Sequence, residues 1–225
     1  SGTVGLEGNL QKCVSVGLLY SVPEPGESVS QPPGIGEEHP LFYGKQCPFP
    51  VQPVQPGDRG EFHELRGYLL AKLMWDPYAD ERVILEDFLK GYYKQAGPLI
   101  LQYIDLIHDE MEKAGGELNI FGGPLDAGDT WMREELFRQY ENLFEDAVFL
   151  TEGDREVQFR VKTAALPIYY AGIVLGYGGP EERFRRIARF AEQARRTGLV
   201  MVEEWKITVD KFVTDAVAEL GTCME

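Results

Sequence analysis

The distribution of proline divides this chain of 225 residues into two parts that obey different folding rules. Nine of the 14 prolines and 10 of the 25 glycines lie in the first 60 residues. Proline removes a backbone donor and fixes φ, so it excludes regular helix and allows strands only at sheet edges. We therefore expect residues 1–59 to be irregular, apart from short strands over Cys13–Val22 and Leu41–Cys47. Such a segment is either a surface wrap or partly disordered leader, or it binds a partner as a polyproline ligand.

From Glu61 onward, apolar residues recur with a period of about 3.6, which is typical of amphipathic helices. This pattern predicts a mainly α fold, in which about seven helices joined by short loops form a second domain over residues 60–225. Pro167 is expected to kink or split one helix, Gly122–Gly128 to form a turn, and Leu199–Val202 to form a short strand. The expected helices begin after Glu61, at Asp80, at Pro98, at Asp129 or Thr130, near Asp154, at Pro180 and near Ile207.

The helical stripes also predict which side chains face the core. A residue belongs to the buried face when apolar neighbours stand three or four positions away. The strongest candidates for burial are Leu65, Leu69, Leu73, Ile104, Ile107, Phe212 and Val213. Val83, Phe184 and Val217 occupy inward positions on the same argument.

The charge balance excludes two classes of protein. The formal net charge is −15, from 37 acidic and 22 basic residues, whereas binding to nucleic acid or to an anionic membrane surface needs a basic face. No apolar run approaches the roughly 20 residues that span a bilayer. The N-terminus has no cationic and apolar leader, so we expect a signal peptide to be absent or already removed. The three cysteines, Cys13, Cys47 and Cys223, lack the spacing of a zinc site or a disulfide framework.

A polar cluster stands at the start of the first expected helix: Glu61, His63, Glu64 and Arg66. Acidic side chains are stabilised there by the helix dipole, so helix-end electrostatics alone accounts for the cluster. The alternative is that the cluster borders a sugar pocket, because a histidine near carboxylates can hold a network of hydroxyl groups or act as a general acid.

A second cluster, Asp105, His108, Asp109 and Glu112, follows the spacing i, i+3, i+4, i+7 of one helical stripe. Four such groups could chelate a cation, but the same pattern is typical of the solvated side of an amphipathic helix. We expect the solvated face, and we expect neither a metal ion nor a cofactor.

The three tryptophans, Trp75, Trp131 and Trp205, are expected in the core or at its boundary, with sugar stacking as the alternative. Glycoside hydrolysis requires two carboxylates that flank the scissile bond, and no residue pattern here identifies such a pair. Serine hydrolase, zinc protease, P-loop and dinucleotide-binding motifs are absent from the sequence.

Residues 60–77 read GEFHELRGYLLAKLMWDP, followed by DFLKGYY at 87–93, AGP at 96–98 and YIDLIH at 103–108. These stretches resemble an uncharacterised bacterial domain family related to the α-glucuronidase type of glycoside hydrolase. In that family a (β/α)₈ barrel is followed by an α-helical domain, and the pattern at 61–77 marks the last barrel helix and the entrance to that domain. The resemblance is strong over residues 60–113, weakens towards residue 205 and does not cover residues 1–56.

The resemblance implies that the barrel is missing from this chain, because a barrel needs about 250 residues and only about 60 precede the motif. The catalytic carboxylates of the family would lie on barrel strand ends, so no catalytic acid or nucleophile is assigned. The loop Asp58–Glu64 would lie at the active-site face. Only Glu61, His63, Glu64 and Arg66 are therefore expected to contact sugar.

Two functions follow from these expectations. The chain is either the helical C-terminal part of a carbohydrate-active protein, inactive without its barrel, or a stand-alone helical interaction module without enzymatic activity. The expected partners are a carbohydrate and either the missing barrel or a second copy of the chain, with no nucleic acid and no membrane. An uncovered apolar face on the first helix favours the first function, and a fully covered helix favours the second.

Overall fold

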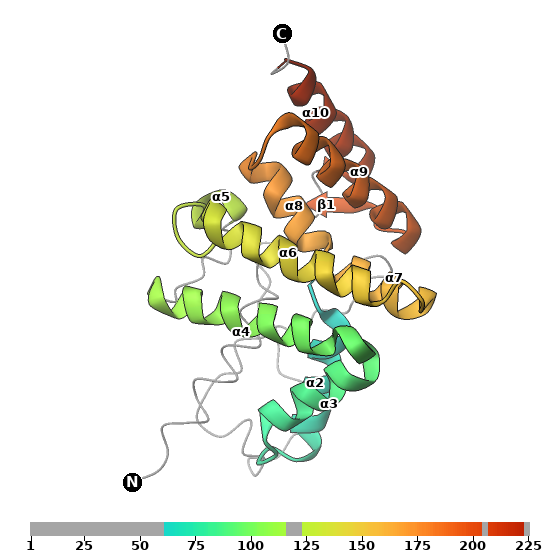
Figure 1. Ribbon diagram of the computed structural model, residues 1–225. Helices are drawn as coiled ribbons and strands as arrows, with labels where there is room; N and C mark the ends of the chain where they lie inside the picture. Colours follow the sequence, from blue (N-terminus) through green and yellow to red (C-terminus); the bar gives the residue numbers. More distant parts are fainter. Residues whose placement is uncertain (1–60, 116–122, 204–206, 223–225) are drawn as a thin grey trace, which may run out of the picture.

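A computed structural model describes residues 61–115, 123–203 and 207–222 of the chain, and these residues are mainly helical, as expected (Figure 1). The expected irregular segment 1–59, with its two short strands, lies outside the described residues, as do Trp205 and all three cysteines. None of the described helices combines the length and apolar composition needed to cross a bilayer. The helices are α2 (His63–Trp75), α3 (Glu81–Tyr92), α4 (Gly97–Lys113), α5 (Pro124–Ala127), α6 (Glu134–Leu150), α7 (Arg155–Ala164), α8 (Leu166–Leu175), α9 (Pro180–Thr197) and α10 (Val209–Thr222), with a 3₁₀ turn, η2 (Lys94–Ala96), between α3 and α4.

The helices stack in three tiers (Figure 1). The α2–α3 hairpin forms one end and packs on α4 through α3. The central tier is α4 against α6, and the other end is α8 and α9 with α10. A short antiparallel pair, β1 (Met201–Glu203) and β2 (Ile207–Thr208), lies between α9 and α10, so the strand expected near residues 199–202 is present.

Local sequence signals set several helix boundaries. Asp80 caps α3, because its Oδ1 accepts from the backbone N–H groups of Arg82 at 2.8 Å and Val83 at 3.3 Å. Asp154 caps α7 in the same way through Val157. Pro167 lies in the first turn of α8, where its missing N–H is not needed, so the expected split at this proline is confirmed.

The core is built around aromatic rings in the central tier. Tyr103 of α4 makes edge and tilted contacts with Tyr140 and Phe144 of α6, with ring centroids 5.6 and 4.8 Å apart. Gly97 lets α4 start close to the end of α3, because a Cβ there would lie 2.9 Å from the carbonyl oxygen of Leu89. A separate small cluster of Leu69, Leu73 and Ile84 joins α2 to α3.

Two boundary predictions were wrong. The segment expected to be a turn at 122–128 contains the single helical turn α5. Neither Asp129 nor Thr130 caps the next helix, because α6 begins at Glu134 with Arg133 at its cap. The Thr130 hydroxyl instead donates to the carbonyl oxygen of Ala127, so it closes the turn after α5.

The burial predictions hold for Leu65, Leu69, Leu73, Ile104 and Ile107 but not for every residue. Phe212 and Val213 are only half-buried at the edge of the core, since α10 is covered mainly on the side of Val209, Ala216 and Leu220. Val83, Phe184 and Val217 are exposed.

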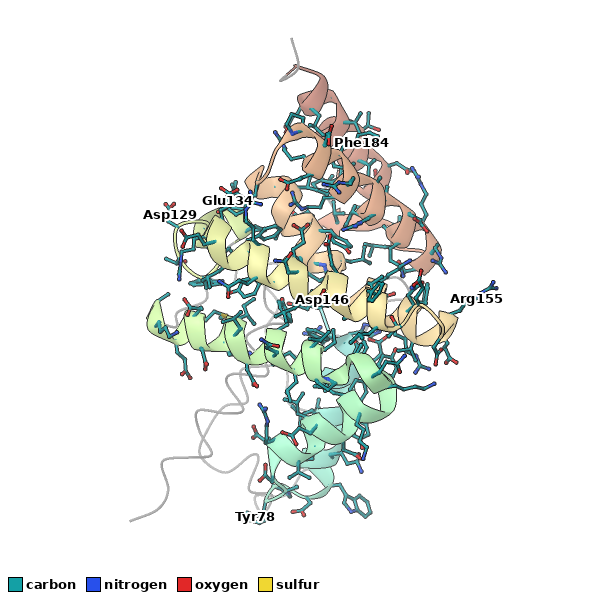
Figure 2. The ribbon with its side chains drawn as sticks, viewed as in Figure 1. Tyr78, Asp129, Glu134, Asp146, Arg155 and Phe184 are labelled. Carbon is teal, nitrogen blue, oxygen red and sulfur yellow. The ribbon has the colours of Figure 1, made fainter. Side chains whose placement is uncertain are left out.

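Each exposed residue lies off the buried side of its helix. On α3 the inward positions are 81, 84, 85 and 89, and Val83 falls beside them. On α9, Arg186 faces inward, and Phe184, two positions before it, projects outward (Figure 2). On α10, Val217 follows the buried Ala216 by one residue and therefore points away from the buried side of the helix.

The buried face of α2 yields a stability prediction. Leu69 is 5% exposed, and Leu69→Ala should lower the free energy of unfolding by about 2–5 kcal/mol, since it leaves a cavity. Val83→Ala on the neighbouring helix is the control and should cost little, because Val83 is 62% exposed. Urea denaturation measures both, and equal costs would show that α2 and α3 do not pack as described.

Candidate functional site

The four residues predicted to contact sugar lie together at the start of α2. Glu61 and Phe62 precede the helix, His63 and Glu64 are in its first turn, and Arg66 follows. Phe62 adopts a left-handed conformation, with φ 49° and ψ 35°, which turns the chain sharply into the helix. This turn places Glu61 against Tyr103 of α4, while His63 and Glu64 remain partly exposed to solvent.

Glu61 is a buried carboxyl group, only 2% exposed. Its Oε1 accepts a hydrogen bond of 2.7 Å from the Tyr103 hydroxyl, and its Oε2 has no hydrogen-bond partner among the described residues. Burial raises the pKa of Glu61 to about 8, although the Tyr103 hydroxyl and the charge of Arg66 both favour the ionised form. At neutral pH this side chain is therefore mainly protonated.

Glu64 is the more accessible acid of the pair, and its side chain is 35% exposed. One oxygen lies 3.0 Å from His63 Nδ1, and the other accepts from the Tyr92 hydroxyl at 3.2 Å. Arg160 of α7 stacks over the Tyr92 ring at 4.3 Å and donates to the Tyr92 carbonyl oxygen at 3.1 Å. A partly exposed His–Glu pair is thus held in place by residues from α3 and α7.

This arrangement combines a neutral buried acid with an accessible carboxylate and imidazole. The Phe62 ring packs on the ring of Tyr103, with the two ring centroids 6.0 Å apart. Of the two acids, Glu64 is the one that can meet a ligand from solvent, and it can accept hydrogen bonds from hydroxyl groups. The assignment of all four residues as sugar contacts stays a prediction.

The second acidic cluster lies on α4, and it is split between different surroundings. Asp105 forms a bidentate pair with Arg82 of α3, at 2.6 and 3.0 Å. Asp109 and Glu112 are exposed, but His108 is only 6% exposed, so the prediction of a fully solvated stripe was wrong for this residue. His108 follows the buried Ile104 by one helical turn, which places it at the edge of the apolar stripe. Within the described ranges, no three His, Cys, Asp or Glu side chains are grouped so as to hold a metal ion.

The two described tryptophans behave differently. Trp131 is half-buried and packs against the core, as expected of a boundary residue. Trp75 is 91% exposed at the end of α2, so the expectation of core or boundary packing was wrong for it. The helix ends directly after Trp75, because Asp76 precedes a proline and adopts an extended conformation.

A polar groove that the sequence analysis missed lies between α6 and α9, over α8. Its volume is about 180 Å³, and it is lined by Arg138, Glu141, Asn142, Glu145, Glu182, Arg185, Arg186 and Arg189. The signal was present in the sequence, because each helix carries its four lining residues at i, i+3, i+4 and i+7. It was hidden because charges at this spacing also suit a solvated face.

The buried Arg186, 4% exposed, organises this groove. It forms a bidentate pair with Glu141 at 2.8 and 2.9 Å and donates to the carbonyl oxygen of Tyr177 at 2.8 Å. Its guanidinium lies 5.0 Å from the centre of the Phe137 ring. With these donors engaged, Arg186 is a structural residue rather than a free anion-binding group.

Comparison with known proteins bears on the first site. A family model described as a domain of unknown function (DUF4838) matches residues 48–105. The matched range begins before Glu61, includes the whole of α2 and α3, and ends inside α4. It supports an uncharacterised domain family over the junction that carries the Glu61 cluster. Neither the curated proteins nor the solved structures give a match.

The groove generates a prediction at Gly172 of α8. A Cβ at this position would lie 2.3 Å from Phe137 Cζ and 2.7 Å from Arg186 Nε. Gly172→Ala should therefore lower the free energy of unfolding by about 1–3 kcal/mol through overpacking. Gly91→Ala is the control, since a Cβ there meets nothing within 4 Å and should not destabilise. A neutral Gly172→Ala in urea denaturation would mean that Arg186 is not fixed against α8.

Proposed function

We propose that this chain is the helical C-terminal part of a carbohydrate-active protein of the glycoside hydrolase type, and that it lacks hydrolase activity without a preceding barrel. The proposal rests on the resemblance of residues 60–113 and on one structural observation, the uncovered apolar face of α2. The family match over residues 48–105 is compatible with it, because that range includes this helix.

The helix α2 is apolar on two sides. One side, with Leu65, Leu69 and Leu73, is buried in the described fold. The other carries Leu70, Met74 and Trp75, which are 48%, 51% and 91% exposed. A helix that is apolar all round is normally buried all round, so the outer side suits a contact with another layer of protein.

Gly67 supports the same interpretation. It lies in the middle of α2, is exposed, and a Cβ there would meet nothing within 4 Å. Glycine inside a helix costs roughly 1 kcal/mol relative to alanine, and no described neighbour requires that cost here. A backbone that approaches α2 closely from outside would require it. Ala71, one turn further on, is also small and exposed, so it would allow the same close approach to α2.

In this proposal the α2 outer face packs against the preceding catalytic domain, and the His63–Glu64 pair lies near the sugar. Glu64 and His63 are the accessible members of the cluster, while Glu61 supports the turn behind them. The helical part then supplies a wall of the substrate pocket, and the carboxylates that break the bond come from the barrel.

The activity of the isolated chain is the first test. We expect no hydrolysis of aryl-glycosides or glucuronides, since hydrolysis needs an acid and a second carboxylate on opposite sides of the bond. Glu61 is buried and Glu64 is its near neighbour at the same helix end, so the two cannot flank a sugar. Turnover that disappears in Glu61→Gln or in Glu64→Gln would contradict the proposal and make the chain a small glycosidase.

The second test asks whether this chain itself covers α2. If the outer face is open, Gly67→Ala should raise the free energy of unfolding by about 0.5–1 kcal/mol through helix propensity alone. Gly91→Ala on α3 is the matched control, because it is also helical, exposed and without neighbours at Cβ. Destabilisation by Gly67→Ala alone would mean that another part of the chain packs closely on α2, which favours the stand-alone module.

A further inference from the structure

Glu61 has a geometry that goes beyond contact with a ligand. The carboxyl group joins the entrance of α2 to the middle of α4, through the hydrogen bond from Tyr103. Tyr103 is 1% exposed and packs on Tyr140 and Phe144 of α6. One hydrogen bond therefore ties the start of α2 to the most buried part of the molecule.

Around Glu61, the Tyr103 hydroxyl and the charge of Arg66 favour the ionised carboxyl, but burial outweighs both. On α2 the charge of Arg66 acts on it, while His63 and Glu64 are paired with each other. After α3 stands Tyr93, 2% exposed, whose pKa is well above its ordinary value chiefly through burial. On α4 the titratable neighbour is Tyr103, and behind it on α6 is Tyr140, whose pKa is also raised by burial.

The turn that presents Glu61 to α4 is itself strained. Phe62 has φ 49°, in the left-handed region that residues with a side chain rarely adopt. Such a conformation is unfavourable by itself and persists only where the surroundings hold it. Here the Phe62 ring contacts the rings of Tyr93 and Tyr103, with centroids 6.4 and 6.0 Å apart. The backbone carbonyl oxygen of Phe62 accepts a hydrogen bond of 2.9 Å from the Arg66 N–H.

We propose that Glu61 is a proton-controlled latch, which holds the first turn of α2 against α4 while it is protonated and releases that turn when it ionises. In the closed state the neutral carboxyl stays under α4. In the open state the carboxylate reaches water, Phe62 relaxes, and the first turn of α2 loses its anchor. The latch would make the junction before α2 sensitive to pH, whichever domain precedes it.

The direction of the pH effect follows from linkage. The pKa of Glu61 is about 8 in the closed state and returns to its ordinary value near 4.5 in the open state. The closed state is therefore favoured fully below about pH 4.5, and its advantage is lost as the pH rises through about 8. Between these limits the opening equilibrium constant should rise up to about tenfold per pH unit, and above them it should level off.

Hydrogen exchange of the Arg66 amide, followed from pH 5 to 9 on the full chain, tests the latch. After correction for the intrinsic exchange rate, protection in the wild type should fall by up to about tenfold per pH unit up to about pH 8. Glu61→Gln keeps the shape of the side chain without the titration, so its protection should not depend on pH. Glu81→Gln is the matched control, because Glu81 is also a buried glutamate, and it should retain the wild-type slope.

Two further variants keep the test decisive if Glu61→Gln does not fold. Tyr103→Phe removes the hydroxyl that favours the ionised carboxyl, so the pH range of opening should extend upward. His63→Gln removes the imidazole that pairs with Glu64 at the start of α2, and it should retain the wild-type slope. A slope that survives in Glu61→Gln, or that is lost in His63→Gln, would overturn the proposal, as would a wild type without a slope.

Discussion

The position of the start of α2 relative to the central tier depends on one interaction, the hydrogen bond that the Tyr103 hydroxyl donates to Glu61. The ring is packed among aromatic residues of α4 and α6, so it belongs to the central tier of the core. Its hydroxyl is satisfied by Glu61 from another tier, and the polar end of a buried tyrosine needs such a partner. The start of α2 is thereby placed with respect to α4, although the contacts of α2 are mainly with α3.

Within the part of the chain that the structure describes, α2 has one buried apolar side and one exposed apolar side. The small cluster that attaches it to α3 contains only Leu69, Leu73 and Ile84 as buried residues, so the hairpin tip has little core of its own. Tyr78 at the turn adds further exposed aromatic surface (Figure 2), and so does Trp75 at the end of α2. The hairpin is thus better suited to be a middle layer between two bodies of protein than the end of one.

The helices could be predicted from the sequence wherever the stripe of apolar residues and the capping residue indicated the same helix boundary. Helices were expected to begin at Asp80 and near Asp154, and both side chains cap them, while Pro167 splits a helix where a missing N–H is harmless. The expectation failed where two signals competed, as at Thr130, whose hydroxyl closes one turn instead of capping the next helix.

The candidate site was only half predictable. The Glu61 cluster was recognisable as a group of polar residues at a helix start, but its contrast between a buried and an open acid was not. That contrast depends on Tyr103, 42 positions away in sequence, and on the left-handed turn at Phe62. No residue type near Glu61 predicts the contact with Tyr103 or the left-handed conformation of Phe62.

The charged groove also determines how α9 is aligned with α6. Pairs join Arg138 to Glu182, Glu141 to Arg186 and Glu145 to Arg189, in the same order along both helices. A slide of α9 by one turn, about 5.4 Å, would set Arg138 against Arg186 in one direction or Glu141 against Glu182 in the other. Each misaligned arrangement breaks the three pairs and brings two like charges together. The groove therefore adds a preference based on charge to the register that the buried apolar side chains of α9 already favour.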